Sequence, residues 1–307
     1  MKFVLGGGIS GLVWTYYHKD HCVITPDTGG QFGNVFSLGA RYLHQNLEAR
    51  AFIRGFGLPI EERTIRVGYS LNSELQSSPP DCFRELYYKK SRATQDLEGF
   101  DETSMNAGKN EFQALNVDFK NLIEKLSADV TKQIIPGKVE RIDLKEKWLY
   151  CDHFRTPYQE VVSTMPLNIF LKAAGMSDEA SKLKSLGITY VLLDESFKDL
   201  KQFDFAYFAG DEPYHRLGRD ENGLVAELTD KRSNKELLQF FGNAYKNHKY
   251  VPGAQLLTKK PSLSFDGVKF LGRYGAWDRS YKTEKVIQEA IQSNIRQSVG
   301  KGTCWCP

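Results

Sequence analysis

The sequence predicts an α/β protein that opens with a strand–helix–strand unit of the kind found in parallel sheets. Residues 2–5 (KFVL) are a short apolar run, as expected for a buried strand. The glycine-rich turn GGGISG follows at residues 6–11, and residues 10–18 carry the apolar and aromatic side chains of a buried helix. A second apolar run, residues 21–25, completes the βαβ unit.

The rest of the chain alternates between helix-like and strand-like stretches. An amphipathic pattern predicts a helix over residues 111–126, because Phe112, Leu115, Phe119 and Leu122 would share one face. Further helices are expected at residues 47–56, 83–90 and 234–246, and a closing helix is expected to begin near Lys282-Thr283. Strands are expected at residues 66–71, on both sides of residues 145–147, in several runs between 187 and 229, and from residue 268.

Composition indicates an ordinary globular protein. Charges nearly balance, with 41 basic and 38 acidic residues among 307, so the totals give no indication of nucleic-acid binding. No apolar run reaches the roughly 18 residues of a membrane span, and no secretory leader is recognisable, so we expect a soluble cytoplasmic protein without a membrane partner. The five cysteines lack metal-site spacing, and we expect no metal.

The turn after the first strand matches a nucleotide-binding fingerprint. Gly6-x-Gly8-x-x-Gly11 lies between a strand and a helix, where glycines permit a tight turn and close approach to a pyrophosphate. The amides of the helix N-terminus then face the phosphates. We therefore expect the following residues to bind a dinucleotide: Gly6, Gly8, Ile9, Ser10 and Gly11.

The acidic residue that usually ends the second strand and binds the ribose is missing from its expected place. Thr25 ends the predicted strand, and Asp27 follows two residues later. Either Asp27 binds the ribose from the loop, or the Thr25 hydroxyl does so with water. A third interpretation is that Asp27 only shapes a turn.

Several segments resemble motifs of the FAD-dependent amine oxidase superfamily. Thr28-Gly29-Gly30-Gln31 is similar to the second glycine motif of those proteins, whose backbone passes under the FAD pyrophosphate. The segment 38–44 (LGARYLH) resembles the stretch that runs past the flavin ring in UDP-galactopyranose mutases and protoporphyrinogen-oxidase-like proteins. Later segments match in the same order: GKVERI at 137–142, VVSTMPL at 161–167, and FLGRYGAW at 270–277.

The resemblance implies a fold and a cofactor. It implies a Rossmann-like FAD-binding domain of the glutathione-reductase type, built from residues 1–67, 128–168 and 262–307. A discontinuous α+β substrate domain would comprise residues 68–127 and 169–261. FAD would be bound by the glycine turn and by further residues that the matching segments supply: Asp27, Gly29, Gly30, Gln31, Gly39, Arg41, Tyr42, Val139, Thr164, Pro166, Gly272, Arg273 and Thr283.

The resemblance has one more departure near the C-terminal helix. Tyr281-Lys282-Thr283 stands where the mutases carry an acidic motif, but Thr283 is able to cap a helix and leave its amides available. That helix N-terminus would face the pyrimidine edge of the flavin, where the reduced ring is negatively charged. Arg273 would neutralise pyrophosphate, with a surface salt bridge as the alternative.

Candidate catalytic residues come from three regions. Tyr207 and the segment that holds His215 and Arg216 resemble strands that line the cavity over the flavin. Arg216 would bind a substrate carboxylate or phosphate, or else bridge to Glu227. His44 and His215 would shuttle protons, or serve as structural histidines. Trp277 would form a wall of the flavin pocket, or pack in the core.

The expected function is FAD-dependent oxidation of a small molecule at an amine-bearing carbon, with hydride transfer to flavin N5. One alternative is a UDP-galactopyranose-mutase-like sugar isomerase that uses reduced FAD. Another is oxidation of an amino-modified DNA base by a phage-type enzyme, since residues 83–92 (FRELYYKKSR) mix basic and aromatic side chains.

Overall fold

The computed structural model describes residues 1–30, 42–72, 74–91, 110–220, 223–258, 261–278 and 280–300. A five-stranded sheet contains the N-terminal strand–helix–strand unit, and all its neighbouring strands pair in parallel. This confirms the expected α/β class. Its strands, in order across the sheet, are β16 (Val268–Phe270), β10 (Glu160–Ser163), β1 (Lys2–Gly8), β2 (His21–Gly29) and β6 (Ile134–Pro136).

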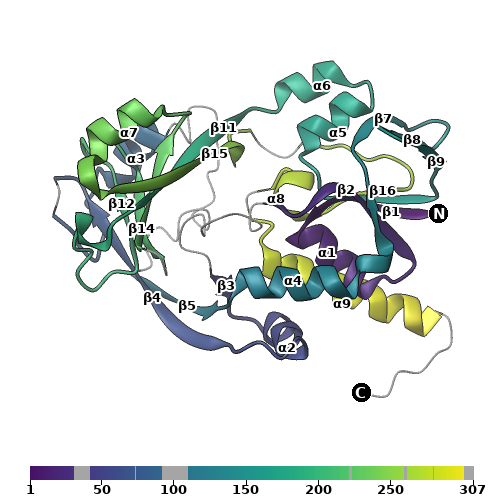
Figure 1. The fold of residues 1–307 in the computed structure, drawn as a ribbon, viewed down its shortest axis with the longest axis horizontal. Coiled ribbons are helices and arrows are strands. Elements are labelled where there is room, and N and C mark those ends of the chain that lie inside the picture. Colours follow the sequence, from purple (N-terminus) through teal and green to yellow (C-terminus); the bar gives the residue numbers. More distant parts are fainter. Residues whose placement is uncertain are drawn as a thin grey trace.

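Helices and a small sheet cover the two faces of this parallel sheet (Figure 1). One face packs against side chains such as Leu12, Leu122 and Val286. The helices that contribute to this cluster are α1 (Ile9–Tyr17), α2 (Leu47–Gly55), α4 (Phe119–Asp129) and α9 (Thr283–Gly300). The other face packs against α5 (Leu167–Ala173), α6 (Ser177–Lys182), β7 (Val139–Asp143) and β8 (Trp148–Cys151), and β9 (Arg155–Pro157) pairs with β8. We refer to the parallel sheet with these elements as the parallel half.

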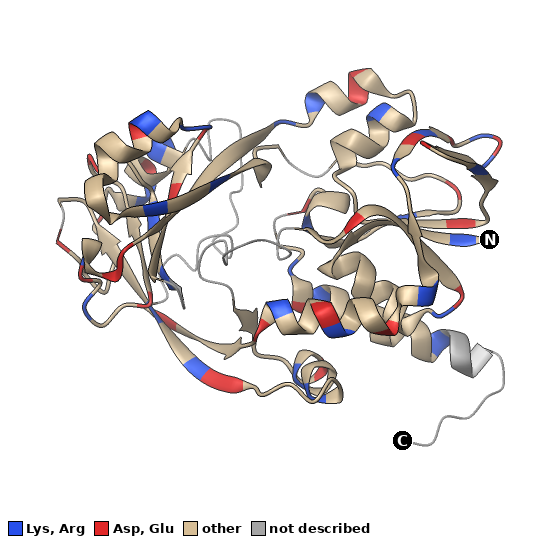
Figure 2. Ribbon diagram, in the orientation of Figure 1, with Lys and Arg blue, Asp and Glu red and all other residues tan. Residues whose placement is uncertain are grey.

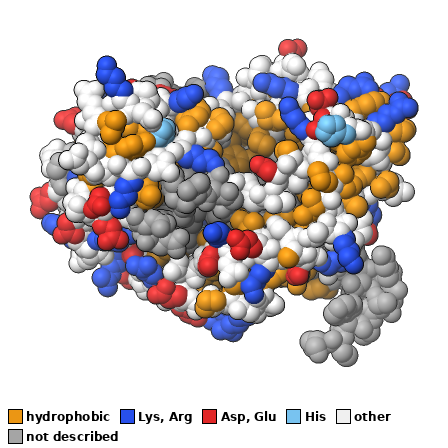
Figure 3. Space-filling view, in the orientation of Figure 1, with side chains coloured by type: hydrophobic (Ala, Val, Ile, Leu, Met, Phe, Trp, Pro, Cys, Tyr) orange, Lys and Arg blue, Asp and Glu red, His pale blue; other side chains and the backbone are white. Residues whose placement is uncertain are grey.

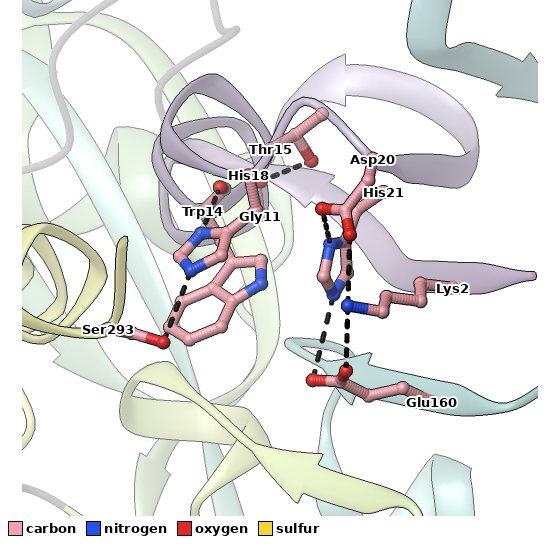
Figure 4. A network of polar contacts seen from close by, with 9 residues as sticks. All are labelled: Lys2, Gly11, Trp14, Thr15, His18, Asp20, His21, Glu160 and Ser293. Atoms are coloured by element: carbon pink, nitrogen blue, oxygen red, sulfur yellow. Dashed lines mark hydrogen bonds and ion pairs between the residues drawn. The ribbon is translucent and has the colours of Figure 1, made fainter. Parts of the chain in front are cut away.

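A polar network joins the first residues of three parallel strands, at the end of the sheet opposite the glycine turn (Figure 4). Lys2 Nζ lies 2.9 Å from one carboxylate oxygen of Asp20 and 3.7 Å from one of Glu160. The His21 ring is fully buried between the same two carboxylates, at 3.0 Å and 3.7 Å. Because strands β1, β2 and β10 each supply one charged or titratable group, the network holds their starting ends together.

A second, eight-stranded sheet forms the other half of the molecule. Its neighbours are antiparallel except for β12 and β4, which are parallel. Across the sheet the strands are β15 (Tyr245–Leu256), β11 (Ser185–Leu193), β14 (Gly223–Thr229), β13 (Arg216–Asp220), β12 (Phe205–Phe208), β4 (Glu61–Ser70), β5 (Glu111–Asn116) and β3 (Leu43–His44). We refer to this sheet with its helices as the eight-stranded half.

Each face of the eight-stranded sheet has its own core cluster. α7 (Asn234–Phe241) contributes Leu237 and Phe241 to one cluster, and α3 (Phe83–Ser91) contributes Phe83 and Tyr87 to the other. The edge strand β3 reaches the parallel half, because its Leu43 is buried in the same cluster as α1 and α9. Acidic and basic residues are interspersed on both halves (Figure 2).

The helix expected over residues 111–126 is wrong in its first part. Residues 111–116 form β5, whose Phe112 and Ala114 alternate with exposed Glu111 and Gln113. The helix α4 begins only after Asp118, whose carboxylate accepts a hydrogen bond from the Asn121 amide as an N-cap. The expected helix over 234–246 is also shorter, because Gly242 ends α7 at a φ of 52°.

Among the residues that the structure describes, no helix is long and apolar enough to cross a membrane.

Candidate dinucleotide site

The glycine turn between β1 and α1 is closely packed against its own backbone and against Thr164. Gly6 has a φ of 104°, and a Cβ there would lie 2.8 Å from Thr164 Oγ1. A Cβ on Gly11 would overlap the carbonyl oxygen of Gly6, so the first turn of α1 packs directly on β1. Both positions therefore require glycine for the fold itself.

Gly8 differs from these two glycines. Its φ of −70° suits any residue, and no atom of the described residues lies within 4 Å of the place where its Cβ would be. Gly8 is the N-cap of α1, and in the described part of the chain no side chain caps this helix end. Ile9 is buried and Ser10 is half-buried in the first turn, which contains no acidic residue. The space beside Gly8 thus adjoins uncapped helix amides, which favour an anion.

The second glycine motif lies beside the first. Gly8 pairs with Gly29 across β1 and β2, and Gly29 has a φ of 92°. A Cβ on Gly30, which has a φ of 55°, would lie 3.2 Å from the Cα of Gly8. The structure therefore brings the two motifs together at the carboxyl end of the parallel strands, as the sequence predicted for Gly29 and Gly30.

Thr25 serves the turn itself. Its hydroxyl oxygen accepts a hydrogen bond from the Gly7 amide at 3.0 Å, and its proton is donated to the Asp27 carbonyl. The Thr25 side chain is buried and its single proton is used, so it is a poor partner for a ribose. Asp27 is exposed at the end of β2, and its binding of the ribose stays a prediction.

The crossover segment after β10 closes the turn from the other side. Thr164 Oγ1 lies 3.0 Å from the carbonyl oxygens of both Leu5 and Gly6 and donates its proton between them. Pro166 is the exposed N-cap of α5. Val139 begins β7 and packs in the cluster on the face of the parallel sheet away from α1. Thr164 thus supports the glycine turn directly, whereas Val139 lies in a separate small sheet.

The segment after β16 completes this end of the sheet. Gly272 has a φ of 75° and lies against Ser10, the second residue of α1. It begins the short helix α8 (Gly272–Gly275), in which Arg273 is exposed. The predicted residues Ser10, Gly272 and Arg273 are therefore neighbours.

Charged side chains surround the N-terminus of α9. Thr283 is its half-buried first residue, and Lys282 precedes it. The pKa of Lys282 is lowered, mainly by burial and also by the positive charge of Arg273. The carboxylate of Glu284 opposes this shift. Burial raises the pKa of the Glu284 carboxyl, against the opposing effects of Lys282 and Arg273. This helix end therefore has two basic groups and a carboxyl whose ionisation is disfavoured.

Lys282 also joins the two halves of the molecule. Its Nζ lies 2.6 Å from Nε2 of His44, which ends β3 in the eight-stranded sheet. The His44 ring stacks on Phe112 with centroids 5.2 Å apart and an angle of 22°. His44, a predicted catalytic residue, thus lies at the α9 N-terminus, close to Arg273 and Thr283.

A row of aromatic rings leads from His44 across the eight-stranded sheet. Phe112 contacts Phe205, Phe205 contacts Tyr207, and Tyr207 contacts Tyr87, at centroid distances of 6.4, 5.4 and 5.2 Å. Hydrophobic side chains also gather on the surface between the two halves in Figure 3. This sheet face therefore connects the α9 N-terminus with the other predicted catalytic residues.

At the far end of this row lies a buried charged cluster. Arg216 on β13 is paired with Glu227 on β14, and Nε2 of His215 lies 3.6 Å from the same carboxylate. Burial opposes ionisation of Glu227, but Arg216 outweighs it and the pKa falls. Burial lowers the pKa of His215. Of the two roles predicted for Arg216, the bridge to Glu227 is the one formed in the structure.

His215 and Tyr207 are both 5% exposed, whereas the Arg216 side chain is 27% exposed. Within the described residues, Nδ1 of His215 has no hydrogen-bond partner. The Arg216 guanidinium is therefore the most accessible member of the cluster.

Trp277 packs in the core. It is 2% exposed, and its Nε1 donates a hydrogen bond to Thr258 Oγ1 at 3.0 Å. Its φ of 52° is unusual for a large side chain and occurs directly after α8. The structure thus places Trp277 against the end of β15 and buries it among core side chains.

The remaining predicted residues are only partly within the described structure. Gln31, Gly39 and Arg41 lie outside the described residues. Tyr42 is half-buried and packs against the cluster that contains Tyr207. The sequence did not single out Lys282 as a functional residue, because a lysine before a helix is common and its partner His44 is distant in the chain.

Comparisons with known proteins place the fold. No protein-family model and no curated protein sequence matches the chain. Among solved structures, the chain is similar to a reduced UDP-galactopyranose mutase, with 12% identity, 97% of this chain and 95% of that chain covered, and a TM-score of 0.70. It is also similar to a wild-type putrescine oxidase bound to putrescine, with 11% identity, coverages of 95% and 98%, and a TM-score of 0.62.

A third similar structure is a CLA-producing fatty acid isomerase from P. acnes, with 11% identity, coverages of 96% and 98%, and a TM-score of 0.62. These three proteins carry out different reactions on one architecture. The likeness extends over nearly the whole chain. It confirms the fold expected from the sequence resemblance, in which a Rossmann-like parallel half is joined to a second half.

Proposed function

We propose that this chain binds FAD at the glycine turn and oxidises a small amine-bearing molecule. The observation that carries the proposal is the space at Gly8. Among the described residues, no atom lies within 4 Å of a Cβ there, although Gly6 and Gly11 of the same turn are closely packed. Together with the uncapped amides that adjoin it, this space among the described residues supports a ligand that approaches the backbone.

The donors around that space suit a pyrophosphate. The uncapped amides at the start of α1 present hydrogen-bond donors and the positive end of the helix dipole. Gly29 and Gly30 let the backbone of the second motif come alongside Gly8, and Arg273 adds an exposed positive charge nearby. Asp27 would bind the ribose at the end of β2, because a carboxylate accepts two hydroxyl hydrogen bonds.

The N-terminus of α9 supports binding of the flavin ring. Lys282, Arg273 and the helix dipole place positive charge in this region, beside the carboxyl of Glu284. When bound, the flavin supplies a hydride acceptor for the carbon that carries the amine. The electropositive helix end would stabilise the negative charge that reduction adds to the ring.

The sheet face between His44 and Arg216 supports the placement of a substrate. Its aromatic side chains exclude water, and the Arg216 side chain, 27% exposed and paired with Glu227, would orient a polar end of the substrate. The putrescine bound by the putrescine oxidase of the same fold supports a small amine as the substrate class. Substrate binding there would leave His44, Tyr207 and His215 as the candidates for proton transfer.

The first test is the absorbance spectrum of the purified protein. We expect flavin bands, and FAD in the supernatant after the protein is denatured. Gly8→Ala should lower FAD affinity at least about tenfold, or about 1.4 kcal/mol, because the methyl group enters the pyrophosphate space. The stability of the FAD-free protein should change by less than about 1 kcal/mol.

Gly55→Ala is the matched control. Gly55 also has no atom within 4 Å of a Cβ position, but it lies in α2 away from the turn. This variant should bind FAD like the wild type. A colourless protein that takes up no FAD, or equal affinity in Gly8→Ala and the wild type, would refute the proposed cofactor site.

The second test concerns the reaction. Anaerobic mixing with a panel of amines, amino acids and amine-bearing nucleosides should bleach the flavin with at least one member. Reduction by dithionite alone would refute amine oxidation and leave the UDP-sugar mutase alternative, which is assayed with reduced protein and UDP-galactopyranose. Bleaching only by amine-bearing nucleosides, with salt-sensitive retention on DNA, would identify the modified-base alternative.

A further inference from the structure

The contact between Lys282 and His44 restricts where the protons of the pair are located. Nζ and Nε2 are 2.6 Å apart, which is a hydrogen-bond distance between one donor and one acceptor. An ammonium group has three donors and no acceptor. If Lys282 carries its proton, Nε2 of His44 must therefore be an unprotonated acceptor.

The protonation of Lys282 follows from its surroundings. Burial and Arg273 lower its pKa, while Glu284 raises it. An ordinary lysine starts about four pKa units above an ordinary histidine, so the proton belongs on the lysine near neutral pH. The neighbouring ammonium also disfavours a second positive charge on the imidazole.

Packing holds the ring in this orientation. His44 stacks on Phe112 of β5, and its backbone is paired with Ala114 of the same strand. The lysine is held in turn because Lys282 directly precedes α9. With Nε2 facing Lys282, the opposite ring nitrogen Nδ1 carries the proton and faces away from the lysine.

We propose that Lys282 is a positioning residue that keeps His44 neutral, with its proton on Nδ1. His44 is then a hydrogen-bond donor through Nδ1 and is not available as a base through Nε2. This statement about the ring does not depend on FAD or on any activity. Its consequence for catalysis, that His44 does not act as a base through Nε2, rests on the proposed function.

The experiment is ¹⁵N–¹H NMR of the histidine rings in the purified full chain, with His44→Gln to assign the signals. The wild type should show His44 with the proton on Nδ1 at pH 7. Lys282→Met removes the donor, so Nε2 should become protonated in part and the titration midpoint of His44 should rise. Lys282→Arg also only donates, and it should preserve the Nδ1-protonated form.

Lys285→Met is the matched control for loss of charge, because Lys285 is exposed on the same helix, where its Nζ lies over the Tyr281 ring. It should leave the His44 signals unchanged. Finding the wild-type proton on Nε2, or the same His44 tautomer and midpoint in Lys282→Met, would overturn the inference. Because NMR reads the ring directly, this result is independent of whether the protein oxidises amines.

If amines do bleach the flavin, a second readout follows. The pH profile of reduction should change in Lys282→Met and be retained in Lys282→Arg, whereas a purely structural role would lower the rate equally at every pH. An unchanged profile in Lys282→Met would overturn the catalytic consequence but not the tautomer.

Discussion

Gly272 lies so close to Ser10 that a Cβ at position 272 would come within 2.7 Å of Ser10 Oγ and 3.1 Å of Ser10 Cβ. This contact holds the segment after the last strand of the parallel sheet against the first turn of its first helix. It joins two glycine motifs that are separated by most of the chain. The φ of 75° at Gly272 adds a second reason for glycine at this position.

Gly272→Ala should therefore destabilise the protein and weaken FAD binding. We expect a loss of about 1–2 kcal/mol from the left-handed backbone alone, and more from the displaced Ser10 hydroxyl. Urea unfolding and FAD retention on gel filtration measure the two effects. The double variant Ser10→Ala/Gly272→Ala should recover only the part of the unfolding free energy that is lost through the clash with the Ser10 hydroxyl. Wild-type stability in Gly272→Ala would contradict the packing described.

Removing the carboxylate of the Arg216–Glu227 pair should be more harmful than replacing the whole pair. Glu227→Gln leaves a mostly buried guanidinium without its counter-ion, which we expect to cost about 3 kcal/mol of unfolding free energy. Arg216→Met/Glu227→Leu should be closer to the wild type because no unpaired charge remains. A loss below about 1 kcal/mol in Glu227→Gln would show that the pair is well solvated.

His18 should make the protein less stable in mild acid. Its Nδ1 donates to the Trp14 carbonyl, Nε2 faces the Ser293 hydroxyl at 3.2 Å, and the ring stacks on Trp14 at 4.0 Å (Figure 4). Burial lowers the pKa of His18, opposed by the Trp14 carbonyl and Asp20 and assisted by His21 and Lys269. The folded state thus binds a proton less readily than the unfolded chain, and stability falls as pH drops below about 6.5.

The free energy of unfolding, measured by urea between pH 7 and pH 5, tests this expectation. His18→Phe should lose about 1 kcal/mol at pH 7 with its hydrogen bonds, but its stability should depend less on pH. His153→Gln is the control, since the His153 side chain is 79% exposed. An equal pH slope in His18→Phe and the wild type would contradict the assignment.

Asp20 should matter for stability above pH 4 and progressively less below it. Burial opposes its ionisation, but hydrogen bonds with Lys2 and His21 outweigh this and lower its pKa to about 2. A depressed carboxyl pKa stabilises the folded state above the unfolded value of about 3.9, and this is lost as pH falls toward 2.

Asp20→Asn should cost less than about 1 kcal/mol at pH 7, because the Asp20 side chain is 47% exposed and the ion pair is screened. The difference in unfolding free energy between Asp20→Asn and the wild type should shrink below pH 4. It should also shrink in about 0.5 M salt, because salt screens the ion pair. Urea unfolding across pH 7 to 3 measures it. A difference that grows in acid would have the wrong sign for this network.

Local patterns predicted the parallel half well. The apolar run before Gly6, the glycine spacing and the run after His21 each specify one element, and these elements are adjacent in the chain. The pattern at residues 111–126 was misleading because Phe112 and Ala114 fit a strand as well as a helix. Pairing with β4 decides between the two, and the side chains of Gln113 and Asn116 bond to residues of β4 that lie 49 and 55 positions away in the chain.

The site was predictable where backbone conformation determines the residue type, as at Gly6, Gly11 and Gly272. It was less predictable where a side chain meets a distant partner. Lys282 and His44 are separated by 238 positions, and neither lies in a pattern that indicates their contact. The sequence left Thr25 as one alternative for ribose binding. It could not show that the Thr25 hydroxyl bonds to Gly7 and Asp27, because these hydrogen bonds form only in the folded turn.

The strand order of the parallel sheet has a consequence for biosynthesis. β1 lies in the centre of the sheet, but its neighbour β10 begins at Glu160 and the edge strand β16 begins at Val268. A ribosome therefore releases the glycine turn long before Thr164, Gly272 and Lys282 exist to support it. If the proposed site is correct, all the segments that line it exist together only after synthesis has passed residue 282, so we expect FAD to be captured late in synthesis.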